Sequence, residues 1–213
     1  FRDSDIETFI RAMKWLTAQG VWVLRMGKIM KKPIAITHKR IIDYAFHPEK
    51  SDSLDIWLFA NCDLCITTGT GADSISEVFK RPILDINFTP LLHIRTYEDT
   101  VTVSKNLFWE NSGVALNCRE YLEHSYQHSK HYEDRGIKIV DLDSTMILKT
   151  VQETWQRVQG TWKETDDDLK KYNKFMKILK NHSDYDKLHG YIHPKARLGT
   201  IWLRSKGKEF FEN

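Results

Sequence analysis

The chain has 213 residues, of which 41% are hydrophobic and 29% charged, so it is expected to fold as a globular protein rather than remain disordered. The formal net charge of +3 is small, and the basic residues are spread along the chain, which argues against nucleic acid as a partner. No apolar run reaches the roughly 18 residues of a membrane span, and no signal peptide is visible.

The first residue and the cysteines of the chain bear on whether it is a fragment and in which compartment it works. The first residue is Phe1 instead of Met, and we interpret the chain as a fragment whose upstream part holds further chemistry. Three cysteines do not make a disulfide framework, so a reducing cytoplasm fits, either free or peripheral at the inner face of the membrane. Cys62 and Cys65 form a C-x-x-C motif, which we interpret as buried thiols rather than a zinc or redox site.

Residues 1–87 alternate between helical and strand patterns. Ser4 to Glu7 has the spacing of a capping box, and Gly20 is placed to end the helix that follows. Ser51 or Ser53 is placed to cap a second helix. Strands are predicted at 21–26, 41–45, 64–67 and 83–86, with a further helix at 72–79. Short apolar strands separated by helices predict an α/β fold with a Rossmann-like parallel sheet and flanking helices.

The second half of the chain is less regular. Residues 88–115 are expected to form a long irregular segment, followed by a helix at 118–131 and a strand at 136–142. Helices are predicted at 144–158, 165–179 and about 198–203, and the second of these is amphipathic and highly charged. We therefore predict a nucleotide-sugar-binding domain over 1–160 and a C-terminal helical extension over 161–213.

The bend at Thr67–Gly71 is the most informative motif. A strand ends in Thr67-Thr68, and Gly69-Thr70-Gly71 then leads into a helix. Glycines permit a sharp turn and close approach of a ligand, and free backbone N–H groups at a helix start bind phosphate. Ligands of open parallel sheets bind beyond the carboxyl ends of the strands, where this bend is expected. Ser74 and Glu77 follow on one polar stripe, which lets Glu77 reach a ribose.

The same letters also suit a plain turn without a ligand. The stretch is neither the Walker sequence, since no Lys-Ser/Thr follows Gly71, nor the dinucleotide G-x-G-x-x-G. Glu77 alone is often a solvated helix residue. On spacing alone, the two readings are equally supported.

The stretch Gly71-Ala72-Asp73-Ser74-Ile75-Ser76-Glu77, followed by Lys80-Arg81-Pro82, resembles the donor-site motif of glycosyltransferases of the two-Rossmann-domain (GT-B) type. The peptidoglycan N-acetylglucosaminyltransferase carries a similar Gly-Ala-x-(Ser/Thr)-x-x-Glu stretch. The resemblance implies that Gly69, Thr70 and Gly71 meet a diphosphate and that Glu77 binds a ribose. The non-hydrolysing UDP-N-acetylglucosamine 2-epimerases share the pattern, so it implies fold and ligand rather than reaction.

Further motifs along the chain resemble a family of bacterial glycosyltransferases encoded with surface-polysaccharide genes. They are Arg2-Asp3-Ser4-Asp5-Ile6-Glu7, Trp22 to Gly27, Ile42 to Ala45, Ser51-Asp52, Thr68 to Gly71, and His193 to Gly199. Members are about twice as long, which implies that this chain is the C-terminal, donor-binding half and that an N-terminal acceptor domain is missing or supplied by a partner chain.

Several other residues are donor-site candidates. Arg25 ends a predicted strand before Gly27, so its guanidinium could stabilise the leaving diphosphate, or it could form a structural ion pair. Arg2 follows what would be a missing first strand and could face the same cleft. In GT-B enzymes the nucleobase of the donor lies near the segment that corresponds to Tyr44-Ala45-Phe46. Packing of Tyr44 in the core is equally consistent with the sequence.

Three weaker candidates leave their alternatives open. Asp85 and Asn87 end a predicted strand and could contact the sugar or cap a turn. His124, His128 and His131 lie at near-helical spacing, which can bind zinc, but the carboxylate-plus-water signature of a zinc site does not accompany them, and we interpret them as a solvated helix face.

The sequence thus predicts transfer of a sugar from a nucleotide diphospho-sugar to a surface glycan or lipid-linked acceptor. We expect no metal and no cofactor, because backbone amides, hydroxyls and Arg25 would neutralise the leaving diphosphate. The catalytic base would lie in the missing domain. The alternatives are a nucleotide-sugar 2-epimerase and a GT-B-like binding module without catalysis.

Overall fold

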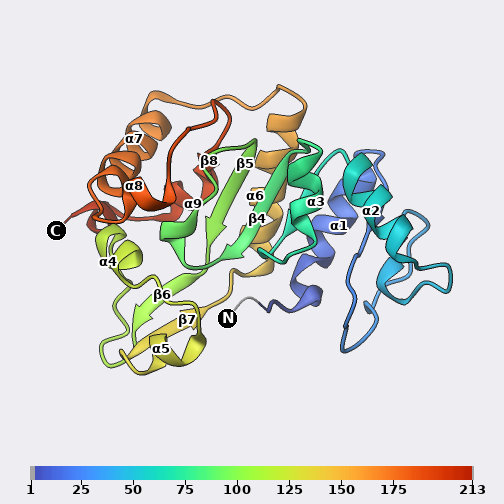
Figure 1. Cartoon of the computed structure of the whole chain (residues 1–213), viewed down its shortest axis with the longest axis horizontal. Helices are drawn as coiled ribbons and strands as arrows, with labels where there is room; N and C mark the ends of the chain where they lie inside the picture. The colour runs from blue at the N-terminus through green and yellow to red at the C-terminus, as the bar shows by residue number, and fades with distance from the viewer. Residues whose placement is uncertain (1–2, 213) are drawn as a thin grey trace.

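A computed structural model describes residues 3–212, and helices alternate with strands along the chain (Figure 1). The strands are β1 (Val23–Leu24), β2 (Ile41–Ile42), β3 (Cys65–Thr67), β4 (Ile83–Phe88), β5 (Thr100–Ser104), β6 (Asn106–Trp109), β7 (Ile137–Val140) and β8 (Arg197–Leu198). The helices are α1 (Ile10–Ala18), α2 (Asp52–Asn61), α3 (Asp73–Val78), α4 (Cys118–Glu123), α5 (Ser129–Glu133), α6 (Ser144–Val158), α7 (Asp166–Lys180), α8 (Tyr185–Leu188) and α9 (Thr200–Ser205). Short 3₁₀ helices are η1 (Ile6–Phe9), η2 (Tyr44–Phe46), η3 (Leu91–His93) and η4 (Lys208–Phe211).

The main sheet has four strands in the order β3-β4-β5-β8, and every pair in it is parallel. All five residues of β5 and five of the six residues of β4 are buried, because helices cover the sheet. In Figure 1, α6 runs behind this sheet and α7 and α9 lie near β8. The predicted class, a parallel α/β sheet with flanking and C-terminal helices, is confirmed.

Strands β1 and β2 form a separate parallel pair, with Val23 opposite Ile41. Both are only two residues long, shorter than the strands predicted at 21–26 and 41–45. The second prediction runs too far because η2 begins at Tyr44. Helix α1 packs against β1, β2 and α6, so it joins this pair to the rest of the molecule.

The segment at 88–115 is not irregular, and this prediction was wrong. It contains η3 and two strands, and β5 is a fully buried strand of the main sheet. Its sequence, Thr-Val-Thr-Val-Ser, alternates polar with apolar residues, whereas a strand covered on both faces is usually apolar throughout. The tertiary structure buries the hydroxyl groups that made this strand unrecognisable.

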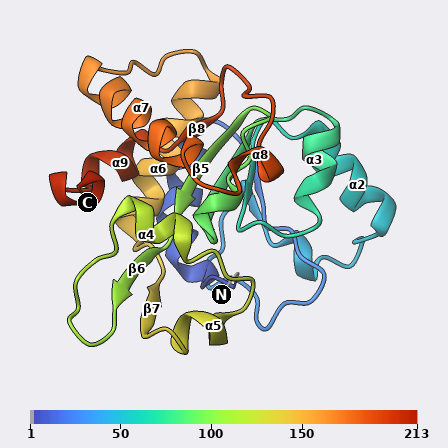
Figure 2. The same ribbon diagram turned by 60° about the vertical axis from the view of Figure 1, so that its left-hand side comes forward.

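Of two predictions further along the chain, one is confirmed and one needs correction. The strand predicted at 136–142 is present as β7, which pairs antiparallel with β6 outside the main sheet. The helix predicted at 118–131 is interrupted, because α4 ends at Glu123 and α5 begins at Ser129. Figure 2 shows β6, β7 and α5 together below the main sheet.

Local capping explains where several helices begin. The Ser51 hydroxyl accepts from the Leu54 N–H at the start of α2, and Thr165 forms a capping box with Asp168 at the start of α7. Near the N-terminus the cap is Asp5, not the predicted Ser4, and its carboxylate accepts from the Glu7 N–H. Helix α6 begins after Asp143 and ends at Val158, as predicted.

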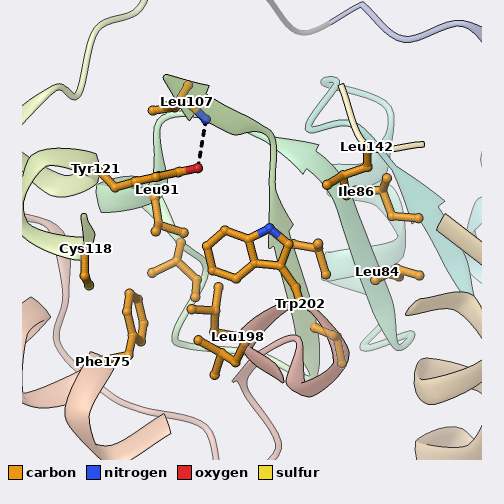
Figure 3. Packing of buried hydrophobic residues seen from close by; sticks show 14 of the residues in the cluster. Leu84, Ile86, Leu91, Leu107, Cys118, Tyr121, Leu142, Phe175, Leu198 and Trp202 are labelled. Carbon is orange, nitrogen blue, oxygen red and sulfur yellow. Dashed lines mark hydrogen bonds between the residues drawn. The ribbon is translucent and has the colours of Figure 1, made fainter. Parts of the chain in front are cut away.

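A single apolar cluster joins the sheet to the C-terminal helices (Figure 3). Leu84 and Ile86 of β4 belong to the same cluster as Phe175 of α7 and Trp202 of α9, and the side chains of these residues are at most 1% exposed. Residues 161–213 also contribute β8 to the main sheet. The core is therefore continuous across residue 160, and the predicted domain boundary stays a prediction. Within the described residues, no helix is both long and apolar enough to cross a lipid bilayer.

Tyr121 supplies a buried hydrogen bond that holds the start of β6. Its hydroxyl accepts from the Leu107 N–H at 2.8 Å and donates to the Lys105 carbonyl at 3.2 Å (Figure 3). We expect Tyr121→Phe to lower the free energy of unfolding by about 1–3 kcal/mol, because the Leu107 N–H loses its partner inside the core. Urea denaturation measures the change. Tyr191→Phe, at a side chain 64% exposed, is the control, and equal effects of the two would contradict the assignment.

Candidate functional site

The predicted phosphate loop follows β3 at the carboxyl end of the main sheet. The Thr67 hydroxyl organises it, because it donates to the Asp73 carboxylate at 3.1 Å and accepts from the N–H groups of Gly69 and Thr70 at 3.1 and 3.5 Å. The Asp73 N–H donates to the Thr70 carbonyl. The inner side of the bend is thus satisfied by the protein itself.

The outer side of the bend is open. Gly71, Ala72 and Ser74 are exposed, and in the part of the chain that the structure describes their N–H groups donate to no protein acceptor. A Cβ built on Gly71 meets nothing within 4 Å, whereas one on Gly69, at φ +79°, lies 3.3 Å from the Phe88 ring. Gly69 therefore serves the turn and the packing of Phe88, and Gly71 is the glycine that leaves room for a ligand.

Helix α3 is shorter than predicted. It spans six residues, from Asp73 to Val78, where the sequence suggested a helix from 72 to 79. So short a helix adds little macrodipole, since the effect depends on aligned peptide units. Any anion binding at this bend must come from the free N–H groups and from the hydroxyls of Thr68 and Thr70.

A buried cluster of charges lies directly beside the bend. Arg95 places one guanidinium nitrogen 2.8 Å from Asp73, another 3.8 Å from Asp85 and the third 3.7 Å from Glu98. The side chains of Asp73 and Asp85 are 1% and 0% exposed. Three carboxylates share a single guanidinium, so the cluster has more acid than base.

The cluster continues as a row of polar side chains across the sheet. Thr67, Asp85 and Thr102 occupy matching positions on β3, β4 and β5. Both oxygens of Asp85 and the Thr102 hydroxyl are buried without a hydrogen-bond partner among the described residues. Burial, together with the negative charges of Asp73 and Glu98, raises the pKa of Asp85 to about 7 despite Arg95. Because the Asp85 side chain is fully buried and its oxygens accept no hydrogen bond from a turn in the described part of the chain, Asp85 neither reaches a sugar nor caps a turn, which were its two predicted roles.

Glu77 lies beside Tyr97 and Glu98. Burial raises the pKa of Tyr97 to about 12, and the Glu77 carboxylate, which forms a hydrogen bond with the phenol, adds to the shift. Burial and the nearby Glu77 likewise raise the pKa of Glu98 to about 7. Glu77 is half-buried, so a ribose would have to share this carboxylate with Tyr97.

Arg25 forms the ion pair that the sequence left as its alternative role. Its guanidinium is 3.2 Å from the Asp43 carboxylate and donates to the Lys32 carbonyl at 2.9 Å, and the residue is 8% exposed. Asp43 in turn accepts from the Ile34 N–H at 2.9 Å. The pair thus holds the backbone of the loop between β1 and β2, and a contact of Arg25 with a diphosphate stays a prediction.

The predicted base-binding segment is divided between core and surface. Tyr44 is 4% exposed and its hydroxyl accepts from the Ser51 N–H, so it packs in the core. The Ala45 N–H donates to the Arg25 carbonyl and the Phe46 N–H to the Asp43 carbonyl, so neither is free to read a base. Phe46 is 45% exposed and lies 5.5 Å from the Arg25 guanidinium. It is the aromatic side chain of this segment that a base could stack on.

The structure gives Gly27, Asn87 and the two cysteines of the C-x-x-C motif roles in packing or in holding the backbone. Met30 folds back over Gly27, since a Cβ on this glycine would lie 2.6 Å from the Met30 sulfur. Asn87 donates to the Ser4 hydroxyl and accepts from the Leu142 N–H, which ties three segments together. Cys65 is buried and Cys62 partly buried, as interpreted from the sequence. Arg2 lies outside the described residues.

Sequence reasoning missed the charged partners of the bend. Arg95 and Glu98 lie in the segment that was expected to be irregular, and nothing in their spacing links them to Asp73 or Asp85. An available signal was the clustering of Arg95, Tyr97, Glu98 and Asp99 between two apolar stretches. The described residues hold no group of three or more His, Cys, Asp or Glu side chains arranged to bind a metal ion. Comparison of the chain with protein-family models, with curated proteins and with solved structures found no match.

Asp85 should make the stability of the fold depend on pH. Its pKa near 7 lies above that of an unfolded aspartate, so its contribution is fully present below about pH 4 and is lost as the pH rises through 7. Asp85→Asn removes the ionisation. The free energy of unfolding of this variant, relative to that of the wild type, should therefore rise by about 1.4 kcal/mol per pH unit between pH 5 and 7. Urea unfolding at several pH values measures this difference. A constant difference would contradict the assignment, and the exposed Asp63→Asn is the control.

Loss of the Arg25 guanidinium should destabilise the protein whether or not a nucleotide binds. Arg25→Ala leaves Asp43, which is 17% exposed, without its cation, and we expect a loss of about 3 kcal/mol. Urea denaturation without nucleotide measures it, with Lys39→Ala on the exposed surface of the same loop as control. If Arg25→Ala lowered the free energy of unfolding no more than Lys39→Ala, the ion pair would not stabilise the fold.

Proposed function

We propose that this chain is the donor-binding half of a glycosyltransferase of the GT-B type, with the diphosphate of a nucleotide-sugar held at Thr67–Gly71. The observation that carries the proposal is that this bend follows β3, the end strand of the four-stranded parallel sheet, at the carboxyl end of that sheet. Ligands of doubly wound sheets bind where the strand order reverses, outside the carboxyl ends of the strands.

The strand pairings support such a reversal next to β3. A Rossmann sheet has the order 3-2-1-4-5-6. The pairs β2–β1 and β3–β4–β5 reproduce this order if one strand is inserted between β1 and β3. In this proposal the inserted strand precedes α1, and its addition joins the two-stranded pair to the main sheet. The bend after β3 would then lie at the point of reversal.

The chemistry of the bend also supports the proposal. Within residues 3–212, the N–H groups of Gly71, Ala72 and Ser74 donate to no protein acceptor, these three residues are exposed, and Thr68 and Thr70 offer hydroxyls beside them. Such donors neutralise the charge that grows on a leaving diphosphate without a metal ion. Phe46 supplies an aromatic face for the base, and Glu77 a carboxylate for the ribose. Arg25 stays a predicted contact, and Asp73 and Asp85 are too deeply buried to touch the sugar.

The remaining parts of the proposal concern partners. The catalytic base and the acceptor site, for a surface glycan or a lipid-linked sugar, would belong to an N-terminal domain or a partner chain. We place the reaction in the cytoplasm, free or at the inner face of the membrane. Donor binding without transfer is the activity proposed for this chain alone.

Gly71 gives the sharpest test of donor binding. A Cβ at Gly71 meets no atom within 4 Å, so Gly71→Val is expected to fold normally yet obstruct a diphosphate that approaches the backbone. The wild type should show a raised unfolding temperature with one of the UDP-, GDP-, CMP- or dTDP-sugars, because ligands that bind the folded state stabilise it. Gly71→Val should weaken that binding at least tenfold.

Gly190→Val is the matched control, because a Cβ at Gly190 also meets no atom within 4 Å. Calorimetry should give the same affinity for Gly190→Val as for the wild type. Equal binding by both variants would place the diphosphate elsewhere, and no binding by the wild type would favour a module without catalysis. Conversion of a free UDP-sugar without any acceptor would instead identify an epimerase.

A further inference from the structure

The loop between β1 and β2 is basic throughout. Its 16 residues, from 25 to 40, contain two arginines and four lysines but no aspartate or glutamate. Outside this loop the chain carries acids and bases in nearly equal number. The small net charge of the whole chain therefore conceals one strongly positive segment.

The tip of the loop combines positive charge with an exposed apolar side chain. Ile29 is 91% exposed, and its neighbours Lys28 and Lys31 have side chains that are 80% and 91% exposed. Met30 instead folds back over Gly27, which leaves Ile29 as the projecting residue. In Figure 1 this loop, drawn in blue, extends away from the sheet and the helices.

The body of the protein holds the backbone of the loop in place. Arg25 donates to the Lys32 carbonyl, Asp43 accepts from the Ile34 N–H, and Glu7 accepts from the Ala35 N–H at 3.2 Å. These contacts follow directly after the tip. The projection of Ile29 is therefore built into the fold, and a partner need not order the loop before it binds.

Neighbouring acids do little to neutralise the lysines. Lys28 lies 3.8 Å from Asp52 and Lys31 lies 3.3 Å from Asp3, and both pairs are almost fully exposed. Exposed ion pairs of this kind are weak and screened by salt. An anionic surface can replace them at little cost.

We propose that this loop docks the protein onto an anionic lipid bilayer. Lys28, Lys31, Lys32 and Lys39 would face the lipid head groups, and Ile29 would enter the boundary between head groups and acyl chains. A single aliphatic residue among lysines suits this partner, whereas binding of single-stranded nucleic acid typically uses aromatic side chains for stacking, and the loop has none. The inference does not depend on the proposed glycosyltransferase function.

Vesicle co-sedimentation tests the proposal. The wild type should bind vesicles of phosphatidylcholine with 30% phosphatidylglycerol, ignore pure phosphatidylcholine, and dissociate as salt is raised. The triple variant Lys28→Gln, Lys31→Gln, Lys32→Gln should bind roughly a hundredfold more weakly, at about fivefold for each lysine. Ile29→Ser should bind about tenfold more weakly with all charges intact.

Matched variants separate the loop from a general charge effect. Lys170, Lys177 and Lys180 are exposed on α7, and their conversion to glutamine removes the same charge from another surface. Val114→Ser, at a side chain 59% exposed, matches the change at Ile29. Both controls should bind like the wild type.

Several results would overturn the proposal. They are absence of wild-type binding to the anionic vesicles, an equal loss in the α7 variant, and unchanged binding by Ile29→Ser together with tighter binding to a single-stranded RNA. Release from vesicles by free UDP would place the lysines in a nucleotide site instead of a membrane surface. Far-UV circular dichroism confirms that each variant is folded.

Discussion

The guanidinium of Arg95 holds together the edge of the sheet where the candidate site lies. It is the cation in contact with Asp73, Asp85 and Glu98, two of which are almost completely buried. A buried carboxylate without a cation or a proton is costly, so these acids depend on Arg95. For Asp85 and Glu98, burial also raises the pKa of the carboxyl group to about 7. The segment that carries Arg95 is in turn held against α3 and β4 by its contacts with Asp73 and Asp85. The shape of the Thr67–Gly71 bend depends on this network through the bond from Thr67 to Asp73.

This network also decides which part of the bend is available. On the inner side of the bend, the N–H groups of Gly69 and Thr70 donate to the Thr67 hydroxyl, and the negatively charged group there is the carboxylate of Asp73. Among the described residues, the outer face offers the N–H groups of Gly71, Ala72 and Ser74, which donate to no protein acceptor. A diphosphate bound there would meet hydroxyls and amides, with Arg95 reducing its repulsion by the buried acids, because the guanidinium contacts Asp73, Asp85 and Glu98. The proposed donor site therefore uses fewer backbone N–H groups of the Thr67–Gly71 bend than the motif alone implies, because those of Gly69 and Thr70 already donate to Thr67.

A second ion pair, Arg25 with Asp43, performs a comparable task at the end of β1. It fixes the loop whose tip presents Ile29 and the lysines, so one charged pair holds the backbone of the loop and positions the proposed membrane surface. The proposed donor site and the proposed membrane surface follow different strands, β3 and β1. If, as proposed, one further strand lies between them, both would lie at the carboxyl edge of one continuous sheet. A transferase acting on a lipid-linked acceptor would use that arrangement, with its acceptor delivered by the surface to which it binds.

The sequence by itself determined the local structure. Apolar periodicity, caps such as Ser51 and Thr165, and the glycine bend after β3 predicted the helices α2, α6 and α7 and the parallel α/β class, because these signals act between residues close in the chain. Only the tertiary structure decided which strands pair and which charges meet. The strand β5 was missed because its threonines are buried by distant helices, and the antiparallel pairing of β7 with β6 was not predicted because pairing partners leave no local signal. The roles of Arg25, Tyr44 and Asp85 were decided in the same way, since burial and a carboxylate or a guanidinium brought from elsewhere in the chain set the chemistry of each side chain.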